Sequence, residues 1–114
     1  MKRFVFSSTS ACYENSTFFP CTEDMPIEPD LIYATTKKQA ESLLQCYKKP
    51  YPGFEVVILR FFNVYGPHQD FRRKQPPLIG YLIKEFMTGG LPMLHSSGHQ
   101  KRDYVYVDDV TDMC

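Results

Sequence analysis

The sequence lacks several features that mark specialised classes of protein. Its 13 basic and 13 acidic residues cancel to a net charge of zero, which leaves no long-range field to attract nucleic acid or an anionic membrane. No apolar run approaches the roughly 20 residues that span a bilayer. The start MKRFVF turns polar too soon for a good signal peptide. We therefore expect a soluble, cytoplasmic protein with no nucleic-acid or membrane partner.

The cysteines show neither a C-x-x-C pair nor a regular spacing, which favours a reduced intracellular setting over a disulfide framework. They are Cys12, Cys21, Cys46 and Cys114. His95 and His99 lie near Asp103, but in a Ser/Gly turn rather than on a helix, and we expect no metal site there. A chain of 114 residues, 43% of them hydrophobic, is one ordinary domain at most.

The first half of the chain has the pattern of a parallel α/β sheet. The continuous apolar run in RFVFSSTS predicts a strand buried on both faces. Residues 14–30 are rich in turn formers and predict a loop. A helix follows from about Ile32 to Lys49, with Asp30 as its N-cap, and EVVILRFF predicts a second strand. This order of elements predicts a right-handed parallel crossover.

The second half is less regular. NVYGPHQDFRRKQPP, residues 63–77, predicts a loop, and Leu78 to Thr88 predicts a second helix. LPML predicts a short strand, and RDYVYVDDV predicts a strand followed by a helix that Asp108 or Asp109 would cap. The chain opens on a buried-type strand and ends where a helix should begin. We therefore expect either part of a larger fold or a unit stabilised by association.

One helix face carries residues that could do chemistry. Tyr33 and Lys37 lie one turn apart, and Thr9 follows the first strand at the end where ligands bind in open parallel sheets. A free phenol has a pKa of about 10, and a neighbouring ammonium stabilises its ionised form. The alternative is a half-buried tyrosine beside a solvated lysine. The spacing alone leaves both interpretations open.

Four stretches decide between these alternatives. FVFSSTSACY, YATTKKQAE, LRFFNVYGP and RDYVYVDDV, in this order, together resemble the NAD-dependent epimerase/dehydratase family, the extended branch of the short-chain dehydrogenase/reductases. The resemblance covers nearly the whole chain. It implies an α/β fold with a partial Rossmann-like parallel sheet, flanking helices and part of a substrate-binding region. Residues 1–66 would be the C-terminal part of a Rossmann-like domain with the catalytic residues, and residues 67–114 part of the substrate-binding region with a returning strand.

The resemblance implies a role for each matching residue. Thr9 matches the catalytic Ser/Thr that holds the substrate oxygen, and Tyr33 matches the general acid/base. Lys37 matches the lysine that binds the nicotinamide ribose and lowers the pKa of the tyrosine. Phe62 lies where the family backbone meets the nicotinamide end of the cofactor. The implied cofactor is NAD, which takes a hydride from the sugar and returns it.

The resemblance also implies a nucleotide-sugar substrate and a partner. Asn63 matches an asparagine that contacts the substrate diphosphate, and Arg102 matches an arginine that clamps it, as the bidentate guanidinium suits. The alternatives are a turn residue for Asn63 and a solvated strand end for Arg102. Helix 32–49 matches a helix that helps to build the family's dimer interface, so a homodimer is expected through it.

The residues after Thr9 bear on the reaction subtype. The related 4,6-dehydratases carry an Asp-Glu pair there, and the sugar-acid decarboxylases carry a glutamate two residues after the threonine. Here Ser10 and Ala11 stand at these positions, and neither can do acid/base work. This favours a UDP-sugar 4-epimerase, with a GDP-sugar epimerase/reductase or a nucleotide-sugar dehydratase as the alternative enzymes.

The largest departure from the family is a missing glycine-rich turn. No G-x-x-G-x-x-G stretch is present to hold a cofactor pyrophosphate, so the chain resembles the middle segment of an epimerase without its main NAD-binding half. Glu14 also replaces a usual glycine, and Leu31-Ile32 replaces a common Ser-Pro. A truncated, catalytically silent family member and an interaction module that pairs with a full-length relative remain alternatives.

Overall fold

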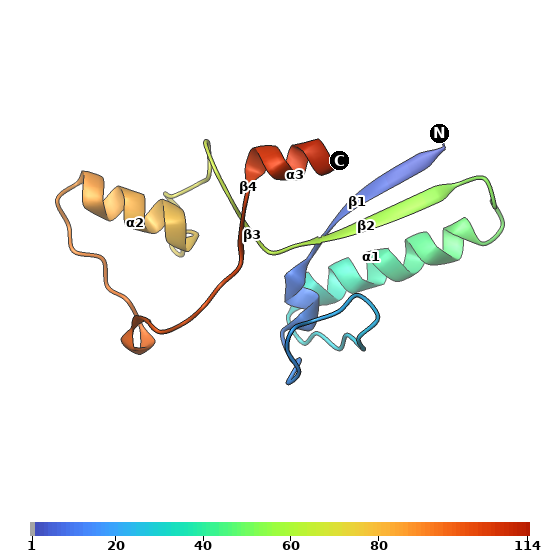
Figure 1. Ribbon diagram of the computed structural model, residues 1–114, viewed down its shortest axis with the longest axis horizontal. Helices are drawn as coiled ribbons and strands as arrows, with labels where there is room; N and C mark the ends of the chain where they lie inside the picture. Colours follow the sequence, from blue (N-terminus) through green and yellow to red (C-terminus); the bar gives the residue numbers. More distant parts are fainter. Residues whose placement is uncertain (1) are drawn as a thin grey trace. The chain divides into compact units, whose positions relative to one another are not determined.

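The protein consists of two compact units, Met1–Phe62 and Asn63–Cys114, in a computed structural model that describes residues 2–114 (Figure 1). The division falls just before the boundary expected after residue 66, and the roles expected of the two parts stay predictions. No helix in the described part of the chain is long and apolar enough to cross a membrane.

The first unit is a parallel strand pair covered by a helix. Strands β1 (Arg3–Thr9) and β2 (Glu55–Phe61) pair in register from one end to the other, and α1 (Ile32–Lys48) packs along them (Figure 1). The parallel crossover is therefore confirmed. The apolar residues of β1 are half-buried rather than buried on both faces, because α1 covers one face of the pair.

The connection between β1 and α1 begins with a short 3-10 helix, η1 (Ser10–Tyr13), and continues as the expected loop. The prediction that Asp30 caps α1 is wrong, because Leu31 occupies the N-cap and makes no side-chain capping bond. Instead, Glu14 Oε1 accepts the backbone N–H groups of Asp30 at 2.7 Å and Leu31 at 2.8 Å. A carboxylate distant in sequence thus serves the donors that lead into the helix.

The second unit contains two short parallel strands and two helices. Strands β3 (Asn63–Tyr65) and β4 (Tyr104–Tyr106) pair with each other, and α2 (Leu78–Met87), η2 (Ser96–Gly98) and α3 (Val107–Met113) complete the unit. The loop expected over residues 63–77 is therefore wrong at its start. Three residues are too few for a periodic signal, and their partner lies far along the chain.

Two further expectations in this unit are wrong. LPML forms no strand, since β3 and β4 pair with each other and leave it without a partner edge among the described residues. Asp108 and Asp109 lie within the first turn of α3 and do not cap it, because Val107 already begins the helix. Gly66 is required beside that helix start, since a Cβ there would lie 2.4 Å from Val107 Cγ1.

Candidate acid/base site

Tyr33 and Lys37 lie on the first two turns of α1, with Lys37 turned toward β1. Lys37 Nζ donates a hydrogen bond of 2.7 Å to the carbonyl oxygen of Ser7. The same nitrogen lies 5.9 Å from the centre of the Tyr33 ring and 5.0 Å from the Phe6 ring, both within cation–π range. The lysine therefore ties the helix to the strand and places a positive charge beside the phenol ring, which is 57% exposed.

Thr9 ends β1 and is buried. Its Oγ1 accepts the backbone N–H of Ala11 at 3.2 Å and so caps η1, which leaves the hydroxyl proton available as a donor. Ser7, whose backbone carbonyl oxygen accepts the Lys37 hydrogen bond, lies two residues before Thr9 in β1. The structure thus brings Lys37 to the strand that carries Thr9.

Phe62 follows β2 at the same edge of the sheet. Thr9 is paired with Phe61 in the parallel register, so Thr9 and Phe62 both lie at the carboxyl ends of their strands. This is the edge where open α/β sheets bind ligands. Phe62 is 43% exposed, which suits a wall against a bound ring.

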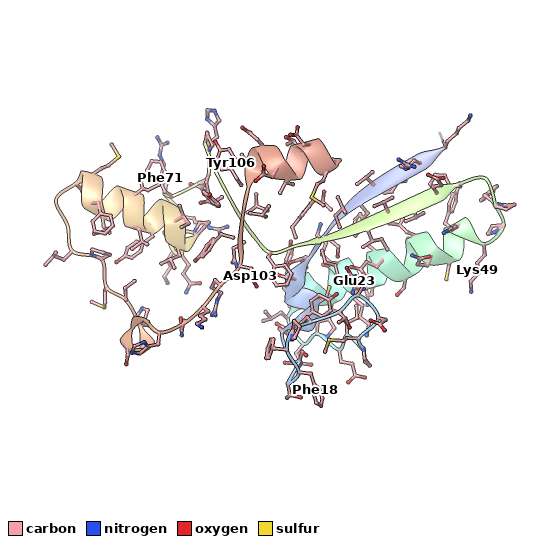
Figure 2. The ribbon with its side chains drawn as sticks, in the orientation of Figure 1. Phe18, Glu23, Lys49, Phe71, Asp103 and Tyr106 are labelled. Carbon is pink, nitrogen blue, oxygen red and sulfur yellow. The ribbon has the colours of Figure 1, made fainter. Side chains whose placement is uncertain are left out.

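Asn63 and Arg102 belong to the second unit and are held by backbone carbonyls. Asn63 Nδ2 donates to the carbonyl oxygen of Asp103 at 2.9 Å, and the backbone N–H of Asn63 donates to the same oxygen at 3.2 Å. Arg102 is exposed and donates from Nη1 to the carbonyl oxygen of Lys101 at 2.8 Å. Asn63 therefore helps to pair β3 with the residue before β4 (Asp103 is labelled in Figure 2), and the substrate roles of both residues stay predictions.

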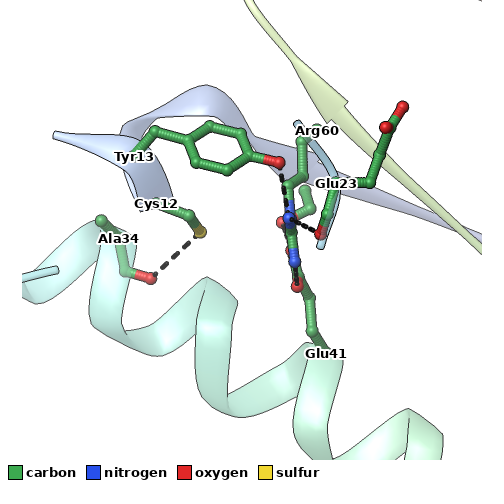
Figure 3. A network of polar contacts seen from close by, with 7 residues as sticks. Cys12, Tyr13, Glu23, Ala34, Glu41 and Arg60 are labelled. Atoms are coloured by element: carbon green, nitrogen blue, oxygen red, sulfur yellow. Dashed lines mark hydrogen bonds and ion pairs between the residues drawn. The ribbon is translucent and has the colours of Figure 1, made fainter. Parts of the chain in front are cut away.

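A buried polar network, which was not predicted from the sequence, joins α1, η1 and the two strands of the first unit (Figure 3). Arg60 Nη2 and Glu41 Oε2 form an ion pair of 2.7 Å, and Arg60 Nε also donates to both carboxylate oxygens. Arg60 Nη1 donates to Tyr13 Oη at 2.6 Å and to the carbonyl oxygen of Glu23 at 3.2 Å. Ser8 Oγ donates to Glu41 Oε1. A single arginine inside the apolar strand EVVILRFF was the signal that could have indicated it.

The network sets the charges of its members. Burial alone would raise the pKa of Glu41, but hydrogen bonds from Arg60 and Ser8 and the charge of Arg60 outweigh it and hold that pKa below its usual value. The hydrogen bond to Glu41 raises the pKa of Arg60. Burial, and next the charge of Glu41, raise the pKa of Cys12, whose thiol lies 3.8 Å from the carbonyl oxygen of Ala34 (Figure 3). Glu41 and Arg60 are both charged at neutral pH.

Both units contain cavities. Those of the first unit include one of about 370 Å³ beside Arg60, Tyr13 and Phe62, one of about 400 Å³ beside Lys38 and Glu41, and one of about 610 Å³ beside Tyr47 and Phe54. In the second unit, a larger and mostly apolar cavity of about 730 Å³ lies between Tyr65 and the Ile83 side of α2. None of these cavities includes Tyr33 or Lys37.

The described residues can be compared with what a metal ion or an NAD molecule would need. Residues 2–114 contain no cluster of three side chains placed to hold a metal ion, and the four cysteines are free thiols. The roles expected of Tyr33, Lys37 and Phe62 at the nicotinamide end of NAD stay predictions. The sequence has no G-x-x-G-x-x-G stretch of the kind that holds a cofactor pyrophosphate.

Comparison with known proteins identifies the family. The model of the NAD dependent epimerase/dehydratase family matches residues 1–114, and the chain belongs to this family. It is 35% identical over 109 residues to a putative UDP-glucose 4-epimerase of Methanocaldococcus jannaschii, covering 95% of this chain and 35% of the relative. It is also 35% identical over 112 residues to the dTDP-D-glucose 4,6-dehydratase of Mus musculus, covering 98% of this chain and 30% of the relative.

A solved structure supports the fold. The UDP-N-acetylglucosamine 4-epimerase from Methanobrevibacter ruminantium M1, in complex with UDP-N-acetylmuramic acid, is 33% identical and superposes with a TM-score of 0.93. The match covers 98% of this chain and 36% of that one. The Rossmann-like α/β fold class is therefore confirmed. The chain spans about a third of the length of the relatives it matches.

Proposed function

We propose that this chain is the acid/base segment of an NAD-dependent nucleotide-sugar epimerase that acts on a UDP-sugar. The observation that carries the proposal is the position of Lys37, which is hydrogen-bonded to Ser7 with its ammonium beside the Tyr33 ring. In this proposal the Tyr33 hydroxyl exchanges a proton with a sugar hydroxyl.

Each of the four candidate site residues in the first unit has a role in this proposal. The Thr9 hydroxyl holds the sugar oxygen, and Tyr33 takes its proton and later returns it. Lys37 has ammonium protons beyond the one that bonds Ser7, and these reach the ribose hydroxyls of the cofactor. Phe62 walls the nicotinamide end. Bound NAD would accept a hydride from the sugar carbon and give it back to the opposite face.

Asn63 and Arg102 would hold the substrate diphosphate. In the described structure Arg102 uses one of its five N–H donors on the Lys101 carbonyl, so most of its planar fork is available for phosphate oxygens. The second Nδ2 proton of Asn63 is available in the same way, because the described contact uses one. A diphosphate next to a sugar is the group that distinguishes this substrate class.

A nucleotide-sugar 4,6-dehydratase is the second candidate, favoured by the match to the mouse enzyme at the same identity as the archaeal relative. Elimination of water needs an additional acid and base near the sugar. Ser10 and Ala11 follow Thr9 within η1, and neither side chain titrates. Epimerisation needs no group beyond the Thr9, Tyr33 and Lys37 set, so it stays our first proposal.

The test is a chimera in which this chain replaces the matched segment of the Methanocaldococcus relative. We expect interconversion of UDP-sugar 4-epimers, and Tyr33→Phe should lower the rate by about 10²–10⁴-fold with no change in thermal unfolding. Thr9→Val is the companion variant, and Tyr47→Phe, at the far end of α1, is the matched control. A folded chimera that releases a keto-deoxy sugar would favour the dehydratase, and an inactive one would favour a silent family member.

Calorimetry on the chain itself separates the remaining alternatives. We expect weak or no binding of NAD, because no cradle for the pyrophosphate is present, and tight binding would overturn that view.

Ile32, Leu43 and Tyr47 of α1 are 84%, 70% and 55% exposed, which supports a homodimer, or pairing with a full-length relative, through this helix. Sedimentation of the chain before and after Leu43→Asp tests that pairing.

A further inference from the structure

Four elements of the first unit meet at one ion pair. Glu41 of α1 accepts hydrogen bonds from Ser8 of β1 and from Arg60 of β2. Arg60 also donates a hydrogen bond to Tyr13 of η1. The Glu41 side chain is 7% exposed and that of Arg60 is 19% exposed. All buried side-chain polar atoms in the described part of the chain have a partner. The network is therefore closed and directional rather than a loose surface cluster.

Three members of the network lie close in sequence to residues of the acid/base site. Ser8 precedes Thr9 in β1, and Glu41 lies one helical turn after Lys37 in α1. Tyr13 ends the short helix that Thr9 caps. The network therefore holds the strand end and the helix that carry the proposed proton-transfer groups, without itself presenting a group to the sugar.

We propose that Glu41 is a positioning residue, which through Ser8 and Arg60 fixes α1 on the sheet so that Lys37 and Tyr33 face the end of β1. This inference rests on the proposed function, because it assigns Glu41 a task for that same site. Successive residues of a strand point to opposite faces. Ser8 thus directs its hydroxyl to the helix, while Thr9 on the other side of the pleat keeps its hydroxyl for the substrate.

A polar tie suits this task better than an apolar one. A buried ion pair adds little net stability over well-packed apolar side chains, but its bonds are directional. Arg60 binds both carboxylate oxygens, which resists rotation and sliding of α1 along the strands. The Lys37 bond to Ser7 lies one turn away on the same helix, so its geometry depends on this placement.

Two variants separate positioning from stability. Ser8→Ala removes only the tie to β1 and keeps the ion pair. The double variant Glu41→Leu/Arg60→Met removes both charges at similar volume, so the fold is expected to persist. The matched control is Arg3→Gln, which breaks an exposed Arg3–Glu55 ion pair between the same two strands. The readout is the ¹⁵N resonance of the Lys37 ammonium in this chain, assigned by its loss in Lys37→Met, and the exchange rate of its protons.

We expect ammonium exchange to accelerate by about 2- to 10-fold in Ser8→Ala, the range that one hydrogen bond supports, and the signal to shift or vanish in the double variant. Arg3→Gln should leave it unchanged. An unchanged Lys37 signal in folded Ser8→Ala overturns the inference, whatever the double variant shows. This readout needs no substrate or cofactor, so an inactive chimera would refute the proposed function while leaving the positioning result to stand or fall separately.

Discussion

The Lys37 ammonium donates a 2.7 Å hydrogen bond to the Ser7 carbonyl oxygen and thereby joins the helix that carries Tyr33 to the strand that ends in Thr9. The bond connects residues that are distant in sequence, and it orients the lysine toward the Tyr33 ring rather than toward solvent. The chemistry proposed for the site depends on this orientation.

Replacing Lys37 by methionine should remove the charge beside the phenol and keep the aliphatic stem. In the chimera we expect the turnover rate to fall by about 10²–10⁴-fold, since the proposed proton-transfer group loses the ammonium beside it. Lys37→Arg keeps the charge and should retain more activity than Lys37→Met. Equal rates for the methionine variant and the unsubstituted chimera would exclude Lys37 from proton transfer.

Replacing Arg60 alone by methionine should destabilise the chain strongly. Glu41 would stay buried without its partner, and we expect the free energy of unfolding to fall by about 3 kcal/mol. This is the lower end of the usual range for breaking a buried ion pair, because the Arg60 side chain is 19% exposed. The double variant Glu41→Leu/Arg60→Met should recover most of that loss. Urea unfolding curves measure both, and equal stability of the single and double variants would contradict the prediction.

The Glu41 carboxylate should also make stability depend on pH. Its folded pKa lies below the ordinary value of 4.5, so the contribution is present above that value and is lost as the pH falls through the folded pKa. We therefore expect unfolding free energy to decline below about pH 4.5. The decline should be smaller in Glu41→Leu/Arg60→Met than in the unsubstituted chain. Parallel curves for the two proteins would show that Glu41 does not contribute.

Cys12 should resist alkylation in the folded chain. It is 1% exposed, and burial, together with the charge of Glu41, raises the pKa of its thiol, so the reactive thiolate is scarce. Cys46 and Cys114 are exposed and serve as internal controls that should react first. Mass spectrometry after iodoacetamide treatment, with and without urea, measures the order. Labelling of Cys12 at the rate of Cys46 would show that η1 does not pack on α1.

Glu14 should stabilise the entry of α1. Its carboxylate accepts two backbone N–H groups, so Glu14→Gly should cost about 0.5–2 kcal/mol, as loss of a helix cap does. Glu14→Gln keeps an acceptor oxygen and is the matched control. Hydrogen exchange at the Asp30 and Leu31 amides should accelerate in the glycine variant. Unchanged exchange at these two amides would show that the Glu14 carboxylate does not stabilise the start of α1.

The elements that the sequence predicted well are those with long patterns. The apolar run of β1, the amphipathic α1 and the β-branched run of β2 gave the parallel crossover that the structure contains. Strand β4 was predicted from the alternating pattern of RDYVYVDDV, but β3 was missed, because it has three residues and its partner lies about forty positions along the chain. The predicted N-cap of α1 was wrong for a related reason, because the amides before this helix are bonded by Glu14, which is remote in sequence.

The candidate site divides in the same way. Thr9, Tyr33 and Lys37 were predicted because their residue types and order resemble a family motif, and the family model matches the whole chain. Glu41 lies in YATTKKQAE and Arg60 in LRFFNVYGP, but no role was predicted for either residue. Their importance comes from a contact between α1 and β2, and no local pattern encodes such a contact.

The amino-acid sequence alone indicated the family and the α/β class, and it predicted the acid/base residues, because these inferences depend on residue type, order and periodicity. The tertiary structure decided which groups meet: the Lys37 ammonium with Ser7, the Glu14 carboxylate with the amides before α1, and Arg60 with Glu41. These are contacts between side chains and groups far apart in the chain. They form only when the crossover brings strand, helix and loop together, since hydrogen bonds and ion pairs act over a few ångströms.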